Sequence, residues 1–112
     1  MMISDAGDVV VVPFPFSDLP LAKPRPALVI SPAASNERAG TTLLAMITTA
    51  AGGSRSDDTP LSDLQAAGLK APSTLRLKLF TLDNRLIARR IGHLSAADRK
   101  SARVAVGALI AL

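Results

Sequence analysis

The segment from Gly7 to Pro32 most constrains the fold, because two apolar runs rich in β-branched residues flank a loop crowded with proline. Residues 8–12 contain four consecutive valines, and β-branched side chains favour strands, where they pack well on a pleated surface. The second run spans residues 27–31. The prolines after the first run and before the second cannot donate to a strand ladder. We therefore expect two strands, at residues 8–12 and 27–31, joined by a long, stiff loop.

Residues 41–49 carry the next strong strand signal, because both of their alternating faces are apolar until the end of the run. This pattern predicts a central strand that is buried on both sides. The polar segment at residues 35–40 ends in glycine and predicts a turn. If this turn joins strands 27–31 and 41–49, the two strands run antiparallel, and the start of one lies beside the end of the other.

Shorter signals downstream predict more strands and a closing helix. From residue 73 the chain alternates, with Leu75, Leu77 and Leu79 on one face and polar Thr74, Arg76 and Lys78 on the other. We also expect a strand at 59–61, helical turns between the Ser62–Gln65 capping box and Gly68, a turn at 82–86, and a strand at 86–89 ended by Gly92. A helix should run from Ser95 to the end of the chain. Its apolar stripe consists of Ala102, Ala105, Val106, Leu109 and Ile110. This order indicates one mainly β domain over residues 1–112, a small antiparallel barrel or sandwich with a C-terminal helix.

Composition excludes several classes of function. The chain has no cysteine and one histidine, which excludes disulfides, thiol chemistry and a multi-histidine metal site. Thirteen Lys and Arg against nine Asp and Glu give a net charge of +4, which favours an anionic partner. Only 3% of residues are aromatic, so the core is built from small aliphatic groups, and dimerisation would bury more surface. We expect no signal peptide and no membrane span, and thus a cytoplasmic protein.

A candidate phosphate site follows from the strand order. Arg25 lies between two prolines that hold the start of its strand in an extended conformation, which places a guanidinium on a stiff support. Antiparallel pairing brings Arg25 beside Thr48 and Thr49, which precede the glycine-rich segment 52–55. An arginine, a hydroxyl pair and backbone N–H groups can together bind a phosphodiester. The plain alternatives are a solvated arginine and threonines that cap a strand end.

Two further features bear on this site. Arg76 and Lys78 share the polar face of a later strand and could extend a basic track. His93 is the only histidine and a conceivable general base, but it follows Gly92 just before the terminal helix, away from Arg25 in chain order. A structural role for His93 is therefore the stronger interpretation.

The same residues carry a resemblance to a known family. The chain resembles the PemK/MazF-type toxins of bacterial toxin–antitoxin pairs over nearly its whole length. The matching segments are Gly7-Asp8-Val9-Val10, the run from Arg25 to Ser31, Ile47-Thr48-Thr49, residues 73–83, and Ile91-Gly92-His93-Leu94-Ser95 before a terminal helix.

This resemblance implies an SH3-like barrel with an antiparallel twisted sheet that forms a homodimer and binds single-stranded RNA in a groove. It implies a sequence-selective endoribonuclease that needs no metal or cofactor and leaves a 2′,3′-cyclic phosphate and a 5′-OH. The implied partners are a cognate acidic antitoxin and, for the toxin–antitoxin complex, DNA. The alternative is a growth inhibitor on the same fold that binds nucleic acid or gyrase without catalysis. The resemblance places the family's key arginine on Arg25, its key threonine on Thr48 and a second basic position of some members on Arg76. We therefore expect Arg25 and Thr48 to be catalytic, and the expected RNA-binding residues are Lys23, Thr49, Ser54, Arg55, Arg76 and Lys78.

Overall fold

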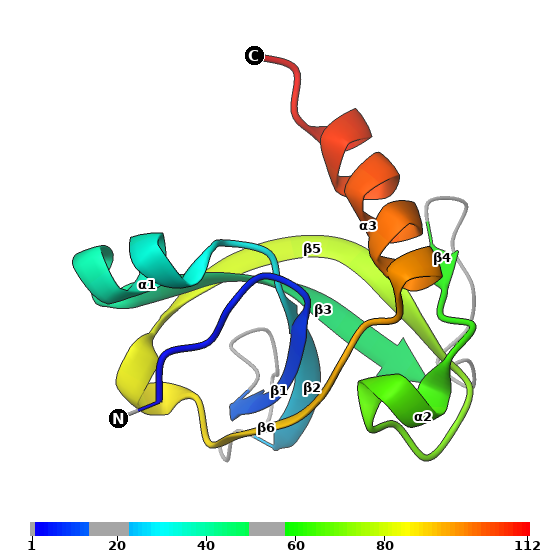
Figure 1. The fold of residues 1–112 in the computed structure, drawn as a ribbon, viewed down its shortest axis with the longest axis horizontal. Helices are drawn as coiled ribbons and strands as arrows, with labels where there is room; N and C mark the ends of the chain where they lie inside the picture. Colours follow the sequence, from blue (N-terminus) through cyan, green and yellow to red (C-terminus); the bar gives the residue numbers. More distant parts are fainter. Residues whose placement is uncertain (1, 14–22, 50–57) are drawn as a thin grey trace.

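A single curled antiparallel sheet forms the centre of the molecule (Figure 1). The computed structural model describes residues 2–13, 23–49 and 58–112. The six strands lie in the order β4-β5-β3-β2-β1-β6. They are β1 (Asp8–Pro13), β2 (Pro24–Val29), β3 (Thr41–Thr49), β4 (Thr59–Pro60), β5 (Ser73–Asp83) and β6 (Arg89–His93), with helices α1 (Ala33–Ala39), α2 (Leu64–Ala67) and α3 (Ala96–Leu109) and a 3₁₀ turn η2 (Asn84–Leu86). The predicted mainly β fold with a C-terminal helix is confirmed.

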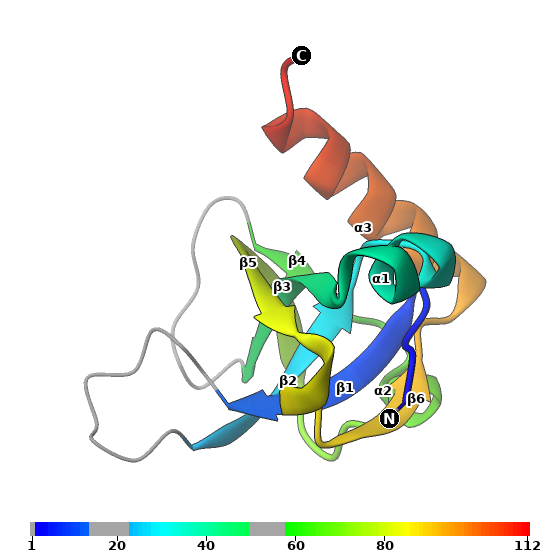
Figure 2. The ribbon, with the colours of Figure 1, turned by 90° about the vertical axis from the view of Figure 1, so that its left-hand side faces the viewer.

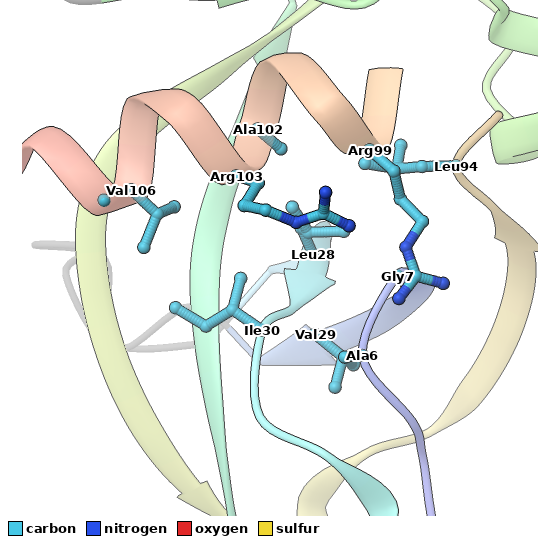
Figure 3. A pocket seen from close by; sticks show the side chains of 11 residues that line it. Ala6, Gly7, Leu28, Val29, Ile30, Leu94, Arg99, Ala102, Arg103 and Val106 are labelled. Carbon is cyan, nitrogen blue, oxygen red and sulfur yellow. The ribbon is translucent and has the colours of Figure 1, made fainter. Parts of the chain in front are cut away.

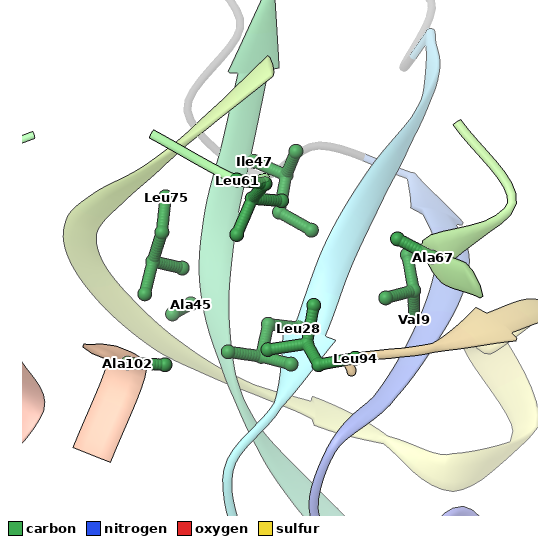
Figure 4. Close-up of a cluster of buried hydrophobic side chains, with 9 residues drawn as sticks. All are labelled: Val9, Leu28, Ala45, Ile47, Leu61, Ala67, Leu75, Leu94 and Ala102. Carbon is green, nitrogen blue, oxygen red and sulfur yellow. The ribbon is translucent and has the colours of Figure 1, made fainter. Parts of the chain in front are cut away.

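The sheet has a hydrophobic cluster on each face. Figure 4 shows the first cluster, between the sheet and the start of α3, with Val9, Leu28 and Ala45 in one row across β1, β2 and β3. The second cluster, on the opposite face, consists of Val10, Val12, Ala27, Val29, Leu44, Phe80 and Ile87. The prediction that β3 is buried on both faces is therefore confirmed. None of the described helices is long and apolar enough to cross a membrane.

The connection from β2 to β3 differs from its prediction, although the two strands are antiparallel neighbours as expected. Residues 33–39 form α1 and not the predicted turn, since alanine, glutamate and arginine favour a helix, and Gly40 ends it at a φ of 75°. The strand β2 also begins earlier than predicted, at Pro24. Prolines lack only the N–H group, and their carbonyls still accept hydrogen bonds, so β1 can pair with this proline-containing start.

The polar face predicted for β5 is a second core. Phe80 joins the second cluster on that face, and Arg76 is buried there. The register of β3 with β5 shifts between Ala45, which pairs with Leu79, and Met46, which pairs with Arg76. This bulge leaves Leu77 and Lys78 without a β3 partner, and Lys78 is exposed.

The last strand, β6, lies at residues 89–93 and not at the predicted 86–89, and Gly92 belongs to it. Glycine is required at position 92 because an added Cβ would lie 2.3 Å from the carbonyl carbon of Ala67 in α2. Gly68, which ends α2 at a φ of 73°, would meet the carbonyl oxygen of Ile91 in the same way. These two glycines let α2 lie directly against β6.

Asp98 clamps α3 to the chain before α2. The predicted Ser95 cap is confirmed, because the Ser95 hydroxyl accepts a hydrogen bond from the Asp98 N–H. The Asp98 carboxylate also accepts bonds from Ser62 N–H, Ser62 Oγ and Asp63 N–H at 2.7–3.1 Å. Burial raises the pKa of Asp98, but the bonds from Asp63, Ser62 and Ser95 outweigh it and hold the pKa below its ordinary value. The helix ends at Leu109, before the predicted end of the chain.

Candidate nucleic-acid site

Strand register places Arg25 and Thr48 on the same face of neighbouring strands. The pairs between β2 and β3 are Ala27 with Met46 and Val29 with Leu44. The pairing ends there, and Arg25 and Thr48 each lie two residues beyond the Ala27–Met46 pair, near the start of β2 and the end of β3. Side chains alternate between the two faces of a sheet, so Arg25 and Thr48 project to the same face as Ala27 and Met46. Figure 2 shows this end of β2 on the side of the molecule that lies away from α3.

Thr74 extends this arrangement into a row across the sheet. Thr48 pairs with Thr74 of β5, and Thr74 pairs in turn with Pro60 of β4. On the other side Arg25 pairs with Val12 of β1. Arg25, Thr48 and Thr74 therefore occupy three neighbouring strands on one face. We call these three residues the polar row.

The members of the polar row differ in exposure. Arg25 is exposed, Thr48 is half-buried and Thr74 is 7% exposed. The Thr74 hydroxyl is buried and has no hydrogen-bond partner within the described part of the chain. Thr74 was predicted to lie on a polar face but not to belong to the site. The signal that could have found it is its place at the start of a strand antiparallel to the one that ends in Thr48.

The remaining predicted site residues fall into two groups. Lys23, Thr49 and Lys78 are exposed, with Lys23 beside the start of β2 and Thr49 at the end of β3. Ser54 and Arg55 lie outside the described residues, as does the glycine pair that precedes them. The described residues contain no group of three or more His, Asp or Glu side chains placed to hold a metal ion.

Arg76, which the sequence placed on a polar face as a possible part of a basic track, is buried. It lies one row from Thr48, opposite Met46, on the same face of the sheet. Its Nε donates to Asp58 Oδ1 at 3.2 Å and its Nη2 donates to Asp58 Oδ2 at 3.1 Å. The two side chains are only 9% and 6% exposed. A buried bidentate pair of this kind holds the residue before β4 against β5. Asp58 was not predicted as a partner of Arg76, because it lies 18 residues away in the sequence.

His93 lies at the opposite end of β1, where Asp8 pairs with it, roughly 13 Å along the strand from the polar row. The His93 Nδ1 atom lies 2.9 Å from the buried Asp8 carboxylate, and Arg99 Nη1 lies 3.2 Å from Nε2. An arginine can only donate, so Nε2 accepts and Nδ1–H donates to Asp8 in this arrangement. His93 is thus held by neighbouring side chains and is not part of the polar row.

A cavity of about 290 Å³ opens between α3 and the far end of β2 (Figure 3). Leu28, Ile30 and Val106 supply apolar walls, and Arg99 and Arg103 of α3 supply its charged side chains. None of the polar-row residues lines this cavity, so it is a separate feature.

Comparisons with known proteins give one family. The family model for the PemK-like, MazF-like toxin of type II toxin–antitoxin systems matches residues 5–110. A comparison with curated proteins finds no match to this chain.

Solved structures are similar over the whole fold. MazF (form I) from Deinococcus radiodurans has 27% sequence identity and a TM-score of 0.76, covering 97% of this chain and 97% of that chain. A MazE–MazF structure (form II) from the same organism has 24% identity and a TM-score of 0.75, covering 97% of this chain and 96% of that one. The toxin MazF-mt6 of Mycobacterium tuberculosis has 22% identity and a TM-score of 0.70, covering 90% and 93%.

Proposed function

Because the chain belongs to the PemK-like, MazF-like toxins of type II toxin–antitoxin systems, we propose that it is a sequence-selective endoribonuclease that cleaves single-stranded RNA without a metal ion. Endoribonuclease activity is typical of this family. The observation that supports the proposal is the antiparallel register of β2 with β3, from which Arg25 and Thr48 lie on one face of neighbouring strands, each two residues beyond the Ala27–Met46 pair. An exposed guanidinium beside a hydroxyl suits a phosphodiester, and the net charge of +4 favours RNA as the anionic partner.

The reaction we propose uses the ribose 2′-OH as the nucleophile. Its oxygen attacks the adjacent phosphorus and releases its proton to water, the bond from phosphorus to O5′ breaks, and O5′ takes up a proton from water. The products are a 2′,3′-cyclic phosphate and a 5′-OH. Arg25 stabilises the negative charge that grows on the phosphorane oxygens, since arginine stays protonated and cannot act as a base. Thr48 binds a non-bridging oxygen or orients the 2′-OH, so positioning supplies much of the rate.

The test is to incubate the purified protein with a mixed RNA pool in EDTA and to map the new ends. We expect 2′,3′-cyclic phosphate and 5′-OH ends at defined sequences. Arg25→Ala should reduce cleavage about 100-fold or more, because the charged stabiliser of the transition state is lost. Thermal unfolding should be unchanged, since Arg25 is exposed. Arg38→Ala, which removes another exposed arginine at the end of α1, is the matched control and should cleave normally.

Two results would contradict this assignment. Wild-type rates from Arg25→Ala would exclude Arg25 from the chemistry. Intact RNA with the wild-type protein, together with growth inhibition in cells, would favour the non-catalytic alternative that binds nucleic acid or gyrase.

We also propose that the protein acts in the cytoplasm as a homodimer silenced by a cognate acidic antitoxin, with DNA as a ligand of the toxin–antitoxin complex. The similar Deinococcus radiodurans structures include MazE–MazF pairs, which supports the antitoxin. Large apolar side chains on and after α3 remain exposed, with Val104 at 68%, Leu109 at 49% and Ile110 at 50%, and this surface supports a second copy as partner.

Sedimentation equilibrium tests the homodimer. We expect a dimer for the wild-type chain and a shift toward monomer for Val104→Asp, because a carboxylate would lose its hydration in the interface. The far-ultraviolet circular dichroism of this variant should match the wild type, since Val104 is exposed in a single chain. A wild-type monomer at all concentrations, or a Val104→Asp dimer of unchanged affinity, would contradict this surface.

A further inference from the structure

Two buried hydroxyl groups have no hydrogen-bond partner within the described part of the chain. They are Ser4 Oγ, in the segment before β1, and Thr74 Oγ1, in the polar row. A buried hydroxyl that makes no hydrogen bond destabilises a fold, because it has lost its contacts with water and gained none in return. Valine has nearly the shape of threonine without this penalty. The Thr74 hydroxyl therefore does not stabilise the fold. Its position opposite Thr48 indicates a role in the site.

Thr74 lies directly opposite Thr48 in the pairing of β3 with β5. Directly opposite residues have Cβ atoms about 4.5–5.5 Å apart, a spacing across which two hydroxyls can hydrogen-bond after a rotation of one side chain. Thr48 is half-buried and Thr74 is buried. A ligand on this face thus meets Thr48 first, with the Thr74 hydroxyl behind it.

We propose that Thr74 is a positioning residue that acts through Thr48, an inference that rests on the nuclease function proposed above. With RNA bound, the Thr74 O–H donates to Thr48 Oγ1, and the Thr48 O–H donates to a non-bridging phosphate oxygen. A hydroxyl has one donor and two acceptor positions, so Thr48 can make both bonds at once. Each bond in such a chain polarises the next, which strengthens the contact to the phosphate as its charge grows in the transition state.

This arrangement predicts an effect on kcat. Thr74→Val removes the hydroxyl and keeps the shape, so it should lower kcat about tenfold with little change in KM, the size expected for one hydrogen bond made in the transition state. Thr74→Ser keeps a hydroxyl and should retain most of the rate. Thr74→Val should also unfold at a higher temperature than the wild type, since it lacks the unpaired hydroxyl.

Two controls separate positioning from a structural effect. Ser4→Ala removes the other unpaired hydroxyl, far from the polar row, and should leave kcat unchanged. In the double-mutant cycle, Thr74→Val added to Thr48→Val should cause no further loss, because the residue through which Thr74 acts is already absent.

Three results would overturn the inference while leaving the nuclease intact: wild-type kcat for Thr74→Val, equal losses for Thr74→Val and Thr74→Ser, or additive losses in the double variant. A wild-type protein that leaves RNA intact would instead overturn the proposed function and this inference with it. That case is recognisable because the wild type and all variants would then be equally silent.

Discussion

Thr74 and Asp98 are both buried polar residues, at 7% and 3% exposure, but their surroundings are opposite. The Asp98 carboxylate accepts bonds from Ser62 and Asp63 and fixes α3 to the segment before α2. The Thr74 hydroxyl has no partner in the described chain. Burial alone thus does not tell structure from function in this molecule. The two residues differ in whether the protein supplies hydrogen-bond partners for the buried group, as it does for Asp98.

Arg76 provides the strongest test of whether pairing inside the protein marks a structural residue. It shares a face with the polar row and is nevertheless paired with Asp58. If Arg76 has a structural role like that of Asp98, Arg76→Met should lower the free energy of unfolding by about 3–5 kcal/mol, since the buried Asp58 carboxylate would lose the charge of Arg76. Urea denaturation measures this change. Adding Asp58→Leu to Arg76→Met should restore most of the stability, because the pair is then replaced by apolar side chains.

The opposite outcome would place Arg76 with the RNA-binding residues. In that case Arg76→Met would keep wild-type stability but weaken RNA binding, and the slope of log affinity against log salt would fall by about 0.7, the value for one phosphate contact to a single strand.

A smaller effect is expected at the Asp98 clamp. Asp98→Asn should lower the free energy of unfolding by about 2 kcal/mol at pH 7, because hydrogen bonds to a charged acceptor are replaced by weaker ones. The pKa of Asp98 is lowered in the folded state, so its contribution is full above pH 4 and is lost as the pH falls through the folded value. The difference between wild type and variant should therefore shrink in acid. Urea midpoints from pH 7 to pH 3 measure this, and a constant difference would show that the Asp98 charge is not responsible.

Local sequence patterns predicted much of the fold. The valine run, the apolar strand at residues 41–49 and the Ser95 cap depend on neighbouring residues, and each lies where the pattern placed it. The antiparallel pairing of β2 with β3 followed from their order, and its register puts Arg25 and Thr48 on one face of the sheet.

The errors have a common physical cause, since they depend on residues distant in the chain. Gly92 was predicted to end a strand, but it belongs to β6 and lies directly against α2. Arg76 was predicted on a polar face, and its partner Asp58 is 18 residues away in the sequence. Likewise, the role proposed for the Thr74 hydroxyl depends on Thr48, which lies opposite it on the neighbouring strand. Alternation along one strand shows which face of the sheet a residue occupies. It does not show whether that face is buried or exposed to solvent.

The close contact of Gly68 and Gly92 has a consequence for assembly. α2 covers the β6 border of the sheet at Gly92, and the strand at the other border, β4, is only two residues long. A partly covered edge and a very short edge strand both disfavour the addition of a further chain by strand pairing. The exposed apolar side chains at the end of α3 offer a second copy a contact through side chains instead.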